Sequence, residues 1–310
     1  MRWIDLTEKK IEYKGKNYDK VLFLMYKSSE QIQELAYIAL KDCWREIKNH
    51  EDKLELQVDR VDKYNLTFII KQSNKIIRRI LVPAIIIHFP TVKAAIDSNT
   101  KAQEIFEEDG VYGLYGIRDK KLLEHIIFST EHSVYFGEDK IPTIIRKAAA
   151  YWYKFSKYQV FLNGNKRTGL LLCLLLLEEG CMKYSYTKDE MYNLAQKIAV
   201  GKISTEQAYN FLLNGITFDY SKMYNLYNSL DFKEKLQKNW QLLNVWLESF
   251  NRKIGGTTME KFNIITSKNI MENLTEIKTA PLSEKDIKKA TMNVLKNKEV
   301  YGAMKALSTK

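Results

Sequence analysis

Apolar residues recur at three- and four-residue spacing through the middle of the chain, from about Thr91 to Gly215. In a helix this spacing places them on one face, so the pattern predicts amphipathic or buried helices. The expected helices cover residues 120–129, 141–157, 168–179, 188–200 and 205–214. The middle of the chain is therefore predicted to be a helical core, which we place at residues 111–215.

Capping residues support two of these boundaries. Thr187 precedes Glu190 by three residues, and Ser204 precedes Gln207 by the same interval. Each pair fits a capping box, in which the two side chains satisfy each other's backbone N–H groups at the start of a helix. Three glycines are expected to end helices in the left-handed conformation: Gly180, Gly201 and Gly215.

The first 110 residues follow a different pattern, in which apolar and polar positions alternate and turn-forming residues separate short runs. Alternation with a period of two is typical of strands. We expect a hairpin at residues 11–18, a strand at 21–26, a helix from Ser28 or Ser29 to about Asn49, and an antiparallel sheet from residues 54–61, 66–71 and 76–83. Residues 1–110 are therefore predicted to be a mixed α/β domain.

The last part of the chain, residues 216–310, returns to helical spacing. One apolar face is expected between Phe232 and Phe250, and Ser283 with Asp286 is expected to cap a final helix that continues past Tyr301. Together the three parts predict an α+β fold: a mixed N-terminal domain, a helical core and a helical C-terminal region.

Composition narrows the class of protein. An apolar content of 45% is sufficient for packed cores, and the longest apolar run, Gly169 to Leu177, is too short to cross a bilayer, which needs about 20 residues. The first residues carry charges where a secretory signal would be apolar, so we expect a cytoplasmic protein without a membrane partner. Its three cysteines have no metal-site spacing and are expected to be free thiols.

The net charge of +11 lies mainly in the second and third parts of the chain. A basic C-terminal region could suit nucleic acid or an acidic partner. However, lysine predominates there and no nucleic-acid motif accompanies it, which favours solvated helix faces over a nucleic-acid site. A non-catalytic binding module acting through residues 216–310 stays open as an alternative to an enzyme.

The residues that carry chemistry precede the apolar run. Positions 159–168 read Gln-Val-Phe-Leu-Asn-Gly-Asn-Lys-Arg-Thr. A short polar loop that opens a helix aims backbone N–H groups and the positive helix end at one point, and Lys166 and Arg167 add two cations. Such a point binds phosphate. The segment is not a P-loop, because residue 159 is Gln where that motif has Gly.

This segment resembles the motif of the Fic/Doc family, and its Lys166-Arg167-Thr168 ending resembles the Doc branch in particular. The segments 116–124 and 136–142 look like the family's approach to its active-site helix, so the resemblance covers roughly residues 111–214. The chain departs from the family at one place, because Gln159 occupies the position of the catalytic histidine.

The resemblance implies a role for each residue of the loop. Arg167 would pair with a phosphate of ATP, while Asn165 and the backbone of Gly164 would line the anion site, closed by Thr168 at the start of the helix. Asn163 stands at the family's metal-side position, where its amide oxygen would help to hold Mg²⁺ without contributing charge. Phe161 is expected to be a packing anchor under the loop.

Lys166 bears on the type of reaction. The resemblance to Doc implies a toxin that transfers the γ-phosphoryl group of ATP to a Ser, Thr or Tyr hydroxyl of a host protein, with a translation factor as one possible target. Most Fic proteins have glycine at this position and transfer AMP instead, and protein AMPylation is therefore the alternative.

Gln159 conflicts with activity, because a carboxamide can hydrogen-bond the attacking hydroxyl but cannot accept its proton. Loss of a positioned base typically lowers the rate on the order of 10²–10⁴-fold. Two origins are consistent with the sequence: an inactivated copy of a toxic enzyme, or a natural pseudoenzyme. His132 is not expected to replace the missing base.

Family members are often restrained by an inhibitory helix with the pattern Ser/Thr-x-x-x-Glu-Gly/Asn. In this chain Thr100 and Glu104 have the spacing, but Ile105 follows. The absence of the full pattern suggests that any restraint comes from a separate antitoxin chain.

Overall fold

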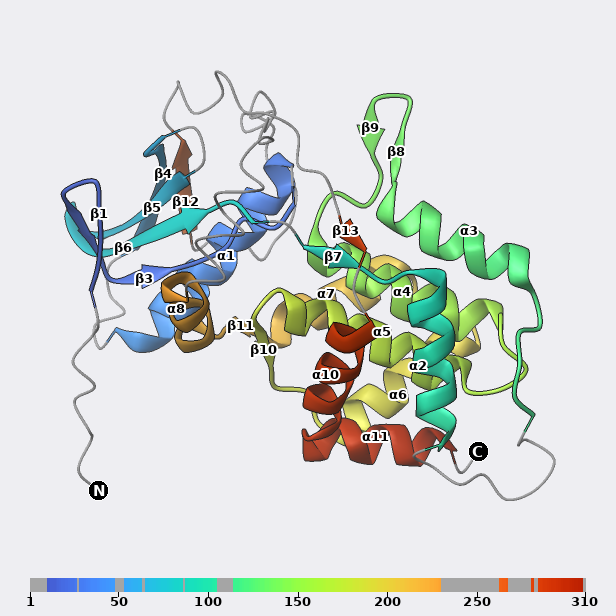
Figure 1. The fold of residues 1–310 in the computed structure, drawn as a ribbon. Coiled ribbons are helices and arrows are strands. Elements are labelled where there is room, and N and C mark those ends of the chain that lie inside the picture. The colour runs from blue at the N-terminus through green and yellow to red at the C-terminus, as the bar shows by residue number, and fades with distance from the viewer. Residues whose placement is uncertain are drawn as a thin grey trace, which may run out of the picture. The chain divides into compact units, whose positions relative to one another are not determined.

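The computed structural model describes residues 10–26, 28–47, 53–62, 65–85, 87–104, 114–229, 262–266, 280–281 and 284–308 (Figure 1). The chain forms two compact units. Unit 1 combines Met1–Ile86 with Phe218–Lys278, and unit 2 combines Ile87–Thr217 with Thr279–Lys310. Helices and strands both occur, which confirms the predicted α+β class. Each unit is discontinuous in sequence, an arrangement that a linear division at residues 110 and 215 cannot represent.

Unit 1 is built on a five-stranded sheet with the strand order β12-β4-β5-β6-β3. Its centre consists of β4 (Leu54–Arg60), β5 (Asn65–Gln72) and β6 (Lys75–Pro83), which pair antiparallel as predicted. The edge strands β3 (Lys20–Val21) and β12 (Phe262–Thr266) pair parallel to β6 and β4. The sheet is therefore mixed rather than antiparallel, because both edges are supplied by segments that are distant in sequence.

Helix α1 (Ser29–Glu46) packs against β4 and β12. Ser28 caps it by accepting a hydrogen bond from the Gln31 N–H at 2.9 Å, and the helix ends before the expected Asn49. Unit 1 also contains α8 (Tyr220–Asn228), which packs against β3, and the hairpin of β1 (Ile11–Tyr13) and β2 (Lys16–Tyr18), which confirms the hairpin predicted at residues 11–18.

Unit 2 is a helical assembly around α5 (Asn165–Glu179), whose apolar run is almost completely buried. Five helices pack against α5: α2 (Val92–Glu104), α4 (Ile144–Tyr158), α6 (Lys188–Ala199), α10 (Glu284–Leu295) and α11 (Lys298–Ser308). Helices α3 (Lys120–Glu131) and α7 (Thr205–Gly215) pack against α4. Among the described residues, no helix is long and apolar enough to cross a membrane.

Three small two-stranded pairs complete unit 2. One is the hairpin of β8 (Val134–Tyr135) and β9 (Glu138–Asp139). The second joins β7 (His88–Phe89) to β13 (Ala280–Pro281), and the third joins β10 (Met182–Tyr184) to β11 (Ile216–Phe218). The three cysteines are free and buried, as predicted.

The helix boundaries in unit 2 largely follow the sequence. Both capping boxes, at Thr187 and at Ser204, are present. Helix α4 begins three residues after the predicted residue 141, because Thr143 is its N-cap and accepts a hydrogen bond from the Arg146 N–H at 3.2 Å. Helix α5 begins three residues before the predicted residue 168, because its first turn is polar and does not contribute to the apolar pattern.

Of the three glycines expected to be left-handed, only Gly201 is so, with φ = 71°. Gly180 has φ = −74°. Gly215 is the last residue of α7, and a Cβ atom there would lie 2.1 Å from Cε1 of Tyr186. Close approach of an aromatic ring, rather than backbone conformation, therefore accounts for this glycine.

The C-terminal segment also differs from expectation. The single final helix is divided into α10 and α11, because the Asn297 side chain accepts hydrogen bonds from the N–H groups of Glu299 and Val300 and opens a new helix. Strand β12 lies in a region that was expected to be helical, where pairing with β4 determines its conformation. The predicted face between Phe232 and Phe250 and the cap Ser283 lie outside the described residues.

Candidate functional site

The segment 159–164 connects α4 to α5 in a tight turn. Helix α4 ends at Tyr158, Gln159 takes a left-handed conformation with φ = 53°, and Gly164 does so with φ = 75° immediately before α5. Phe161 is buried and stacks on Phe155 of α4 with 6.0 Å between ring centroids. The buried Phe161 ring thus holds the loop against α4, which agrees with the packing role expected for Phe161.

Asn165 holds the loop in this shape. Its Oδ1 accepts a hydrogen bond from the Phe161 N–H at 2.8 Å, and its Nδ2 donates to the Phe161 carbonyl at 2.9 Å and to Gln159 Oε1 at 3.1 Å. The side chain is buried, so the whole amide is used to order the loop. Asn165 thus shapes the site with its side chain, while its backbone N–H lies in the first turn of α5.

Gln159 is fixed at both ends of its amide. Its Nε2 donates to the Ser156 carbonyl at 2.9 Å, and its Oε1 accepts from Asn165. The side chain at position 159 is therefore held beside the first residue of α5. This is the place from which a group at position 159 could reach a molecule bound at the N-terminus of that helix.

The N-terminus of α5 has the features of an anion site. Its N-cap, Gly164, provides no side-chain cap, and the Thr168 N–H makes the first helical hydrogen bond, to Gly164 O at 2.9 Å. The N–H groups of the first turn lack helical acceptors, and the helix dipole adds partial positive charge there. A phosphate oxygen is the ligand that such an arrangement favours.

Helix α2 packs directly on this loop, which the sequence did not predict. Asn99 Nδ2 donates to the Asn163 carbonyl and to Thr168 Oγ1, both at 2.9 Å. Gln103 Nε2 donates to Asn99 Oδ1 at 2.8 Å. A Cβ atom on Gly164 would lie 2.9 Å from Asn99 Nδ2, so glycine is required both by the backbone and by α2. The sequence feature that could have indicated this contact is the pair of amide side chains of Asn99 and Gln103, which lie four residues apart and therefore on one face of a helix.

The two cations of the loop have different neighbours. Arg167 is 1% exposed, and its Nη1 donates to the Ala102 carbonyl of α2 at 3.1 Å. Burial lowers the pKa of Arg167 to about 10, so its guanidinium is still protonated at neutral pH. Lys166 Nζ donates to Gln196 Oε1 of α6 at 3.1 Å. In these contacts the two charged groups diverge instead of meeting at one point.

Asn163, the proposed metal ligand, has its Oδ1 engaged by the Gly164 N–H at 2.7 Å. Within the described part of the chain, no group of three or more His, Cys, Asp or Glu residues is arranged to hold a metal. Mg²⁺ prefers several oxygen ligands, usually including carboxylates or phosphates. The side chains of the site therefore do not fit a magnesium ion held by the protein alone.

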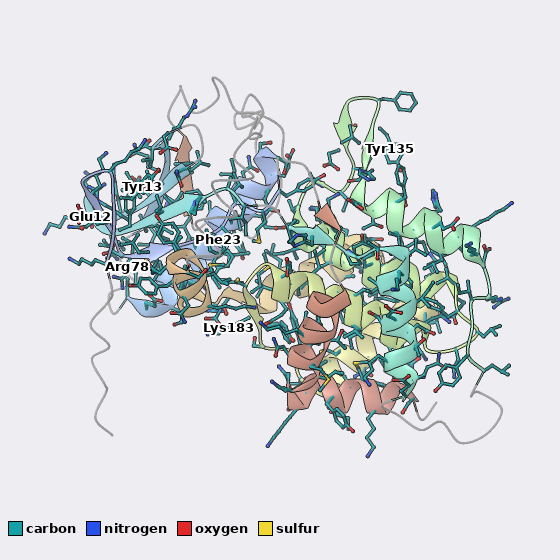
Figure 2. The ribbon with its side chains drawn as sticks, in the orientation of Figure 1. Glu12, Tyr13, Phe23, Arg78, Tyr135 and Lys183 are labelled. Carbon is teal, nitrogen blue, oxygen red and sulfur yellow. The ribbon has the colours of Figure 1, made fainter. Side chains whose placement is uncertain are left out.

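The β8–β9 hairpin presents apolar side chains to solvent. Val134, Tyr135 and Phe136 are exposed, and Figure 2 shows Tyr135 on the hairpin. Below it, the fully buried Lys147 donates to the Thr130 carbonyl at 2.8 Å, the Glu131 carbonyl at 3.0 Å and Ser133 Oγ at 2.8 Å. The hairpin is thus anchored to α4 through this lysine.

His132 ends α3, where its ring lies 4.7 Å from that of Phe128 and its Nε2 lies 3.8 Å from Glu131 Oε1. These contacts keep it at the α3 terminus and give it no described contact with the loop. The expectation that it does not substitute for a base at position 159 remains a prediction.

A family model described as the Fic/DOC family matches residues 95–177, a range that begins within α2 and ends within α5. The match covers well under half of the chain and includes the β8–β9 hairpin, α4, the loop and α5. It supports a Fic-type transferase in general. No curated protein matches the chain.

Proposed function

We propose that residues 159–168 form the nucleotide-phosphate site of a Doc-like protein phosphotransferase, and that Gln159 leaves this form of the chain nearly inactive. The observation that carries the proposal is the bond from Asn165 Nδ2 to Gln159 Oε1, which holds position 159 beside the N-terminus of α5. A base at this position would stand next to a phosphate bound by the first turn of the helix.

The residues divide the work of transfer as follows. The first-turn N–H groups of α5 receive the phosphate oxygens, and Lys166 and Arg167 offset their charge. The hydroxyl oxygen of the target protein forms a bond to the γ-phosphorus as the bond from that phosphorus to the β–γ bridging oxygen breaks, and ADP leaves. The hydroxyl proton passes to the base at position 159. Glutamine can donate and accept hydrogen bonds there, but it cannot take the proton.

Lys166 supports phosphoryl transfer over AMP transfer. Its stem leaves the first turn of α5 and its ammonium donates to Gln196 of α6, so a side chain extends from the helix N-terminus to α6 where glycine would have none. A lysine in this place restricts how far the outer phosphates can extend. Protein AMPylation remains the alternative reaction for the same loop.

Arg167 constrains the proposal. Its guanidinium is buried and one of its five N–H groups donates to Ala102 O of α2, so a phosphate would have to reach the other N–H groups or displace this bond by exchange. Such an exchange replaces a neutral acceptor with a charged one, which strengthens the hydrogen bond. A separate antitoxin chain that stabilises α2 in the described position would restrain the reaction.

Labelled ATP provides the test. The Gln159→His chain is incubated with bacterial lysate and with ATP labelled on either the α- or the γ-phosphate. We expect γ-label on a host protein, and Gln159→Asn, which keeps an amide, serves as the matched control. Retention of α-label would replace the kinase assignment with AMP transfer. Bound nucleotide without any transfer would instead support a pseudoenzyme.

A further inference from the structure

Unit 1 contains a polar cavity of about 600 Å³ between the β1–β2 hairpin and the sheet. Its lining includes Lys14, Lys16 and Tyr18 from the hairpin segment together with Arg60, Thr67 and Arg79 from the sheet segment. The volume lies in the range of roughly 300–1,000 Å³ typical of small-molecule sites. None of the lining residues lies in the matched range 95–177, so the cavity is formed by residues other than those of the loop 159–168.

The strand register creates a polar face at this place. Asp59 of β4 pairs with Thr67 of β5, and Ile69 of β5 pairs with Arg79 of β6, so these side chains share one face of the sheet. Along β4 they alternate with the fully buried Leu56 and Val58, which point to the other face. Alternation therefore separates an apolar face from a polar one.

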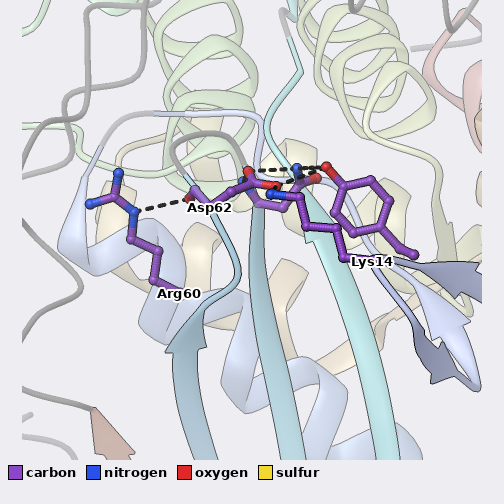
Figure 3. Close-up of polar contacts among 5 residues, drawn as sticks. Lys14, Arg60 and Asp62 are labelled. Carbon is purple, nitrogen blue, oxygen red and sulfur yellow. Dashed lines mark hydrogen bonds and ion pairs between the residues drawn. The ribbon is translucent and has the colours of Figure 1, made fainter.

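The hairpin brings further cations to this face. Lys14 and Gly15 both have positive φ, at 50° and 70°, which gives a tight two-residue turn between β1 and β2. Lys14 Nζ pairs with Asp62 Oδ2 at 2.8 Å, and Tyr13 Oη donates to the same oxygen at 2.8 Å (Figure 3). The ion pair ties the hairpin to the end of β4.

The acidic groups of the cavity are already engaged. Asp62 accepts hydrogen bonds from Tyr13 Oη and, at 2.9 Å, from Asn65 Nδ2 in addition to its bond with Lys14. Asp59 accepts from Gln57 Nε2 at 2.8 Å. Four basic and two acidic side chains line the cavity. Among the described residues, neither the Lys16 ammonium nor the Arg79 guanidinium forms an ion pair, although the Arg79 backbone N–H donates to Asp19 Oδ2 at 2.8 Å, so the surplus side-chain charge of the lining is positive.

Two of the residues that line the cavity carry buried hydroxyls. Tyr18 is 1% exposed and Thr67 is 7% exposed, and within the described residues neither Tyr18 Oη nor Thr67 Oγ1 has a hydrogen-bond partner. Burial raises the pKa of Tyr18, which keeps its hydroxyl protonated and able to donate. Unpaired buried hydroxyls are unfavourable, and a ligand with acceptor oxygens would pair them.

We propose that this cavity binds a small phosphate ester. Lys16 and Arg79 supply the charge that a phosphate monoester requires, and the hydroxyls of Tyr18 and Thr67 supply neutral donors beside it. The two carboxylates in the wall disfavour an extended polyanion such as nucleic acid, which binds along a continuous basic surface. Inorganic phosphate, sugar phosphates and nucleoside monophosphates share the required chemistry.

Calorimetric titration of the full chain with inorganic phosphate, ribose 5-phosphate and AMP tests the proposal. We expect saturable binding of an ester that is weakened roughly tenfold to a hundredfold in Arg79→Gln, the loss typical of one charged hydrogen bond. Lys75→Gln is the matched control, because Lys75 is exposed on the same strand and outside the cavity. Inorganic phosphate binding as tightly as the esters would overturn the assignment to an ester, because it would show that the phosphate group alone is recognised.

Tyr18→Phe gives a second readout that does not depend on removing charge. Loss of an unpaired hydroxyl should leave the melting temperature of the ligand-free chain unchanged or raise it. The increase in melting temperature on addition of ligand should be smaller in the variant than in the parent. AMP could also bind at the loop 159–168. Lys166→Gln should weaken AMP binding at that loop but not in this cavity, so the two sites can be tested independently. Equal affinity of the parent and Arg79→Gln, equal losses in Lys75→Gln, or no saturable binding of any probe would overturn the proposal.

Discussion

Asn165 Nδ2 donates a hydrogen bond to Gln159 Oε1 across 3.1 Å, and so connects the first residue of the loop to the first residue of the helix that follows it. The same asparagine side chain also bonds both backbone groups of Phe161. One buried amide therefore fixes the loop and the side chain that would perform the chemistry. The bonds to Phe161 do not involve the side chain of residue 159, so we expect the loop to keep its shape when residue 159 is replaced.

Replacing Gln159 with His is expected to restore both transfer and toxicity. A base at this position should recover about 3–5 kcal/mol of the activation barrier, which corresponds to a rate increase on the order of 10²–10⁴-fold. Induction of the two forms side by side in a bacterial host measures toxicity. Growth arrest by the Gln form, or neither arrest nor transfer by the His form, would mean that this chain does not act through the loop.

Gly164→Ala should destabilise the chain by about 1–3 kcal/mol, because the new Cβ combines a left-handed backbone with a close approach to Asn99. Gly201→Ala is the control, since Gly201 is also left-handed but has no atom within 4 Å of the added Cβ. Urea unfolding of both variants isolates the effect of α2. Equal losses would show that only backbone strain matters.

Asn99→Ala should lower the free energy of unfolding by about 1–3 kcal/mol, because it removes the buried hydrogen bonds that join Asn99 to the Gln103 amide and to the Asn163 carbonyl. The neighbouring Ser98→Ala removes a buried hydroxyl that has no partner among the described residues, and it should be nearly neutral. A similar loss in both variants would contradict the role assigned to Asn99.

Lys147 should make stability depend on pH. Burial lowers its pKa to about 8, against the attraction of Asp139 and Glu131. Between pH 8 and the pKa of an unfolded lysine, about 10.4, the unfolded chain binds more protons at this site, so stability rises with pH. Below pH 8 both states are protonated and the unfavourable contribution is complete.

The measurement compares the parent with Lys147→Met by urea unfolding at pH 7 and pH 10. The difference in unfolding free energy, parent minus variant, should grow with pH, because only the parent carries the titrating amine. Lys121→Met, at an exposed position of α3, is the control. A difference independent of pH would show that the hydrogen bonds to Thr130 and Ser133 hold the lysine charged.

Local signals in the sequence predicted much of unit 2. The two capping boxes at Thr187 and Ser204 define helix starts by contacts within four residues, and the loop 159–168 combines a left-handed glycine with a polar first turn. The packing of Asn99 on this loop could not be predicted in the same way, because it joins residues 64 and 69 positions apart. Periodicity identifies a buried helix face but not its neighbour.

In unit 1, too, strand pairing could be predicted between neighbours in sequence but not between distant segments. The antiparallel strands β4, β5 and β6 follow one another and were predicted from alternation, whereas β3 and β12 join the sheet from a distance. The phosphate-ester cavity was also absent from the prediction, because it depends on the register that aligns Ile69 with Arg79. A shift of one residue would have placed these side chains on opposite faces.

The position of β12 has a consequence for synthesis of the protein on the ribosome. Its partner β4 ends at Arg60, and the strand that covers the outer edge of β4 begins only at Phe262. At typical translation rates, that edge waits on the order of tens of seconds for its neighbour. During this interval its unpaired N–H and C=O groups can template association with other chains. The outer edge of β4 is therefore open to such association until residue 266 has emerged.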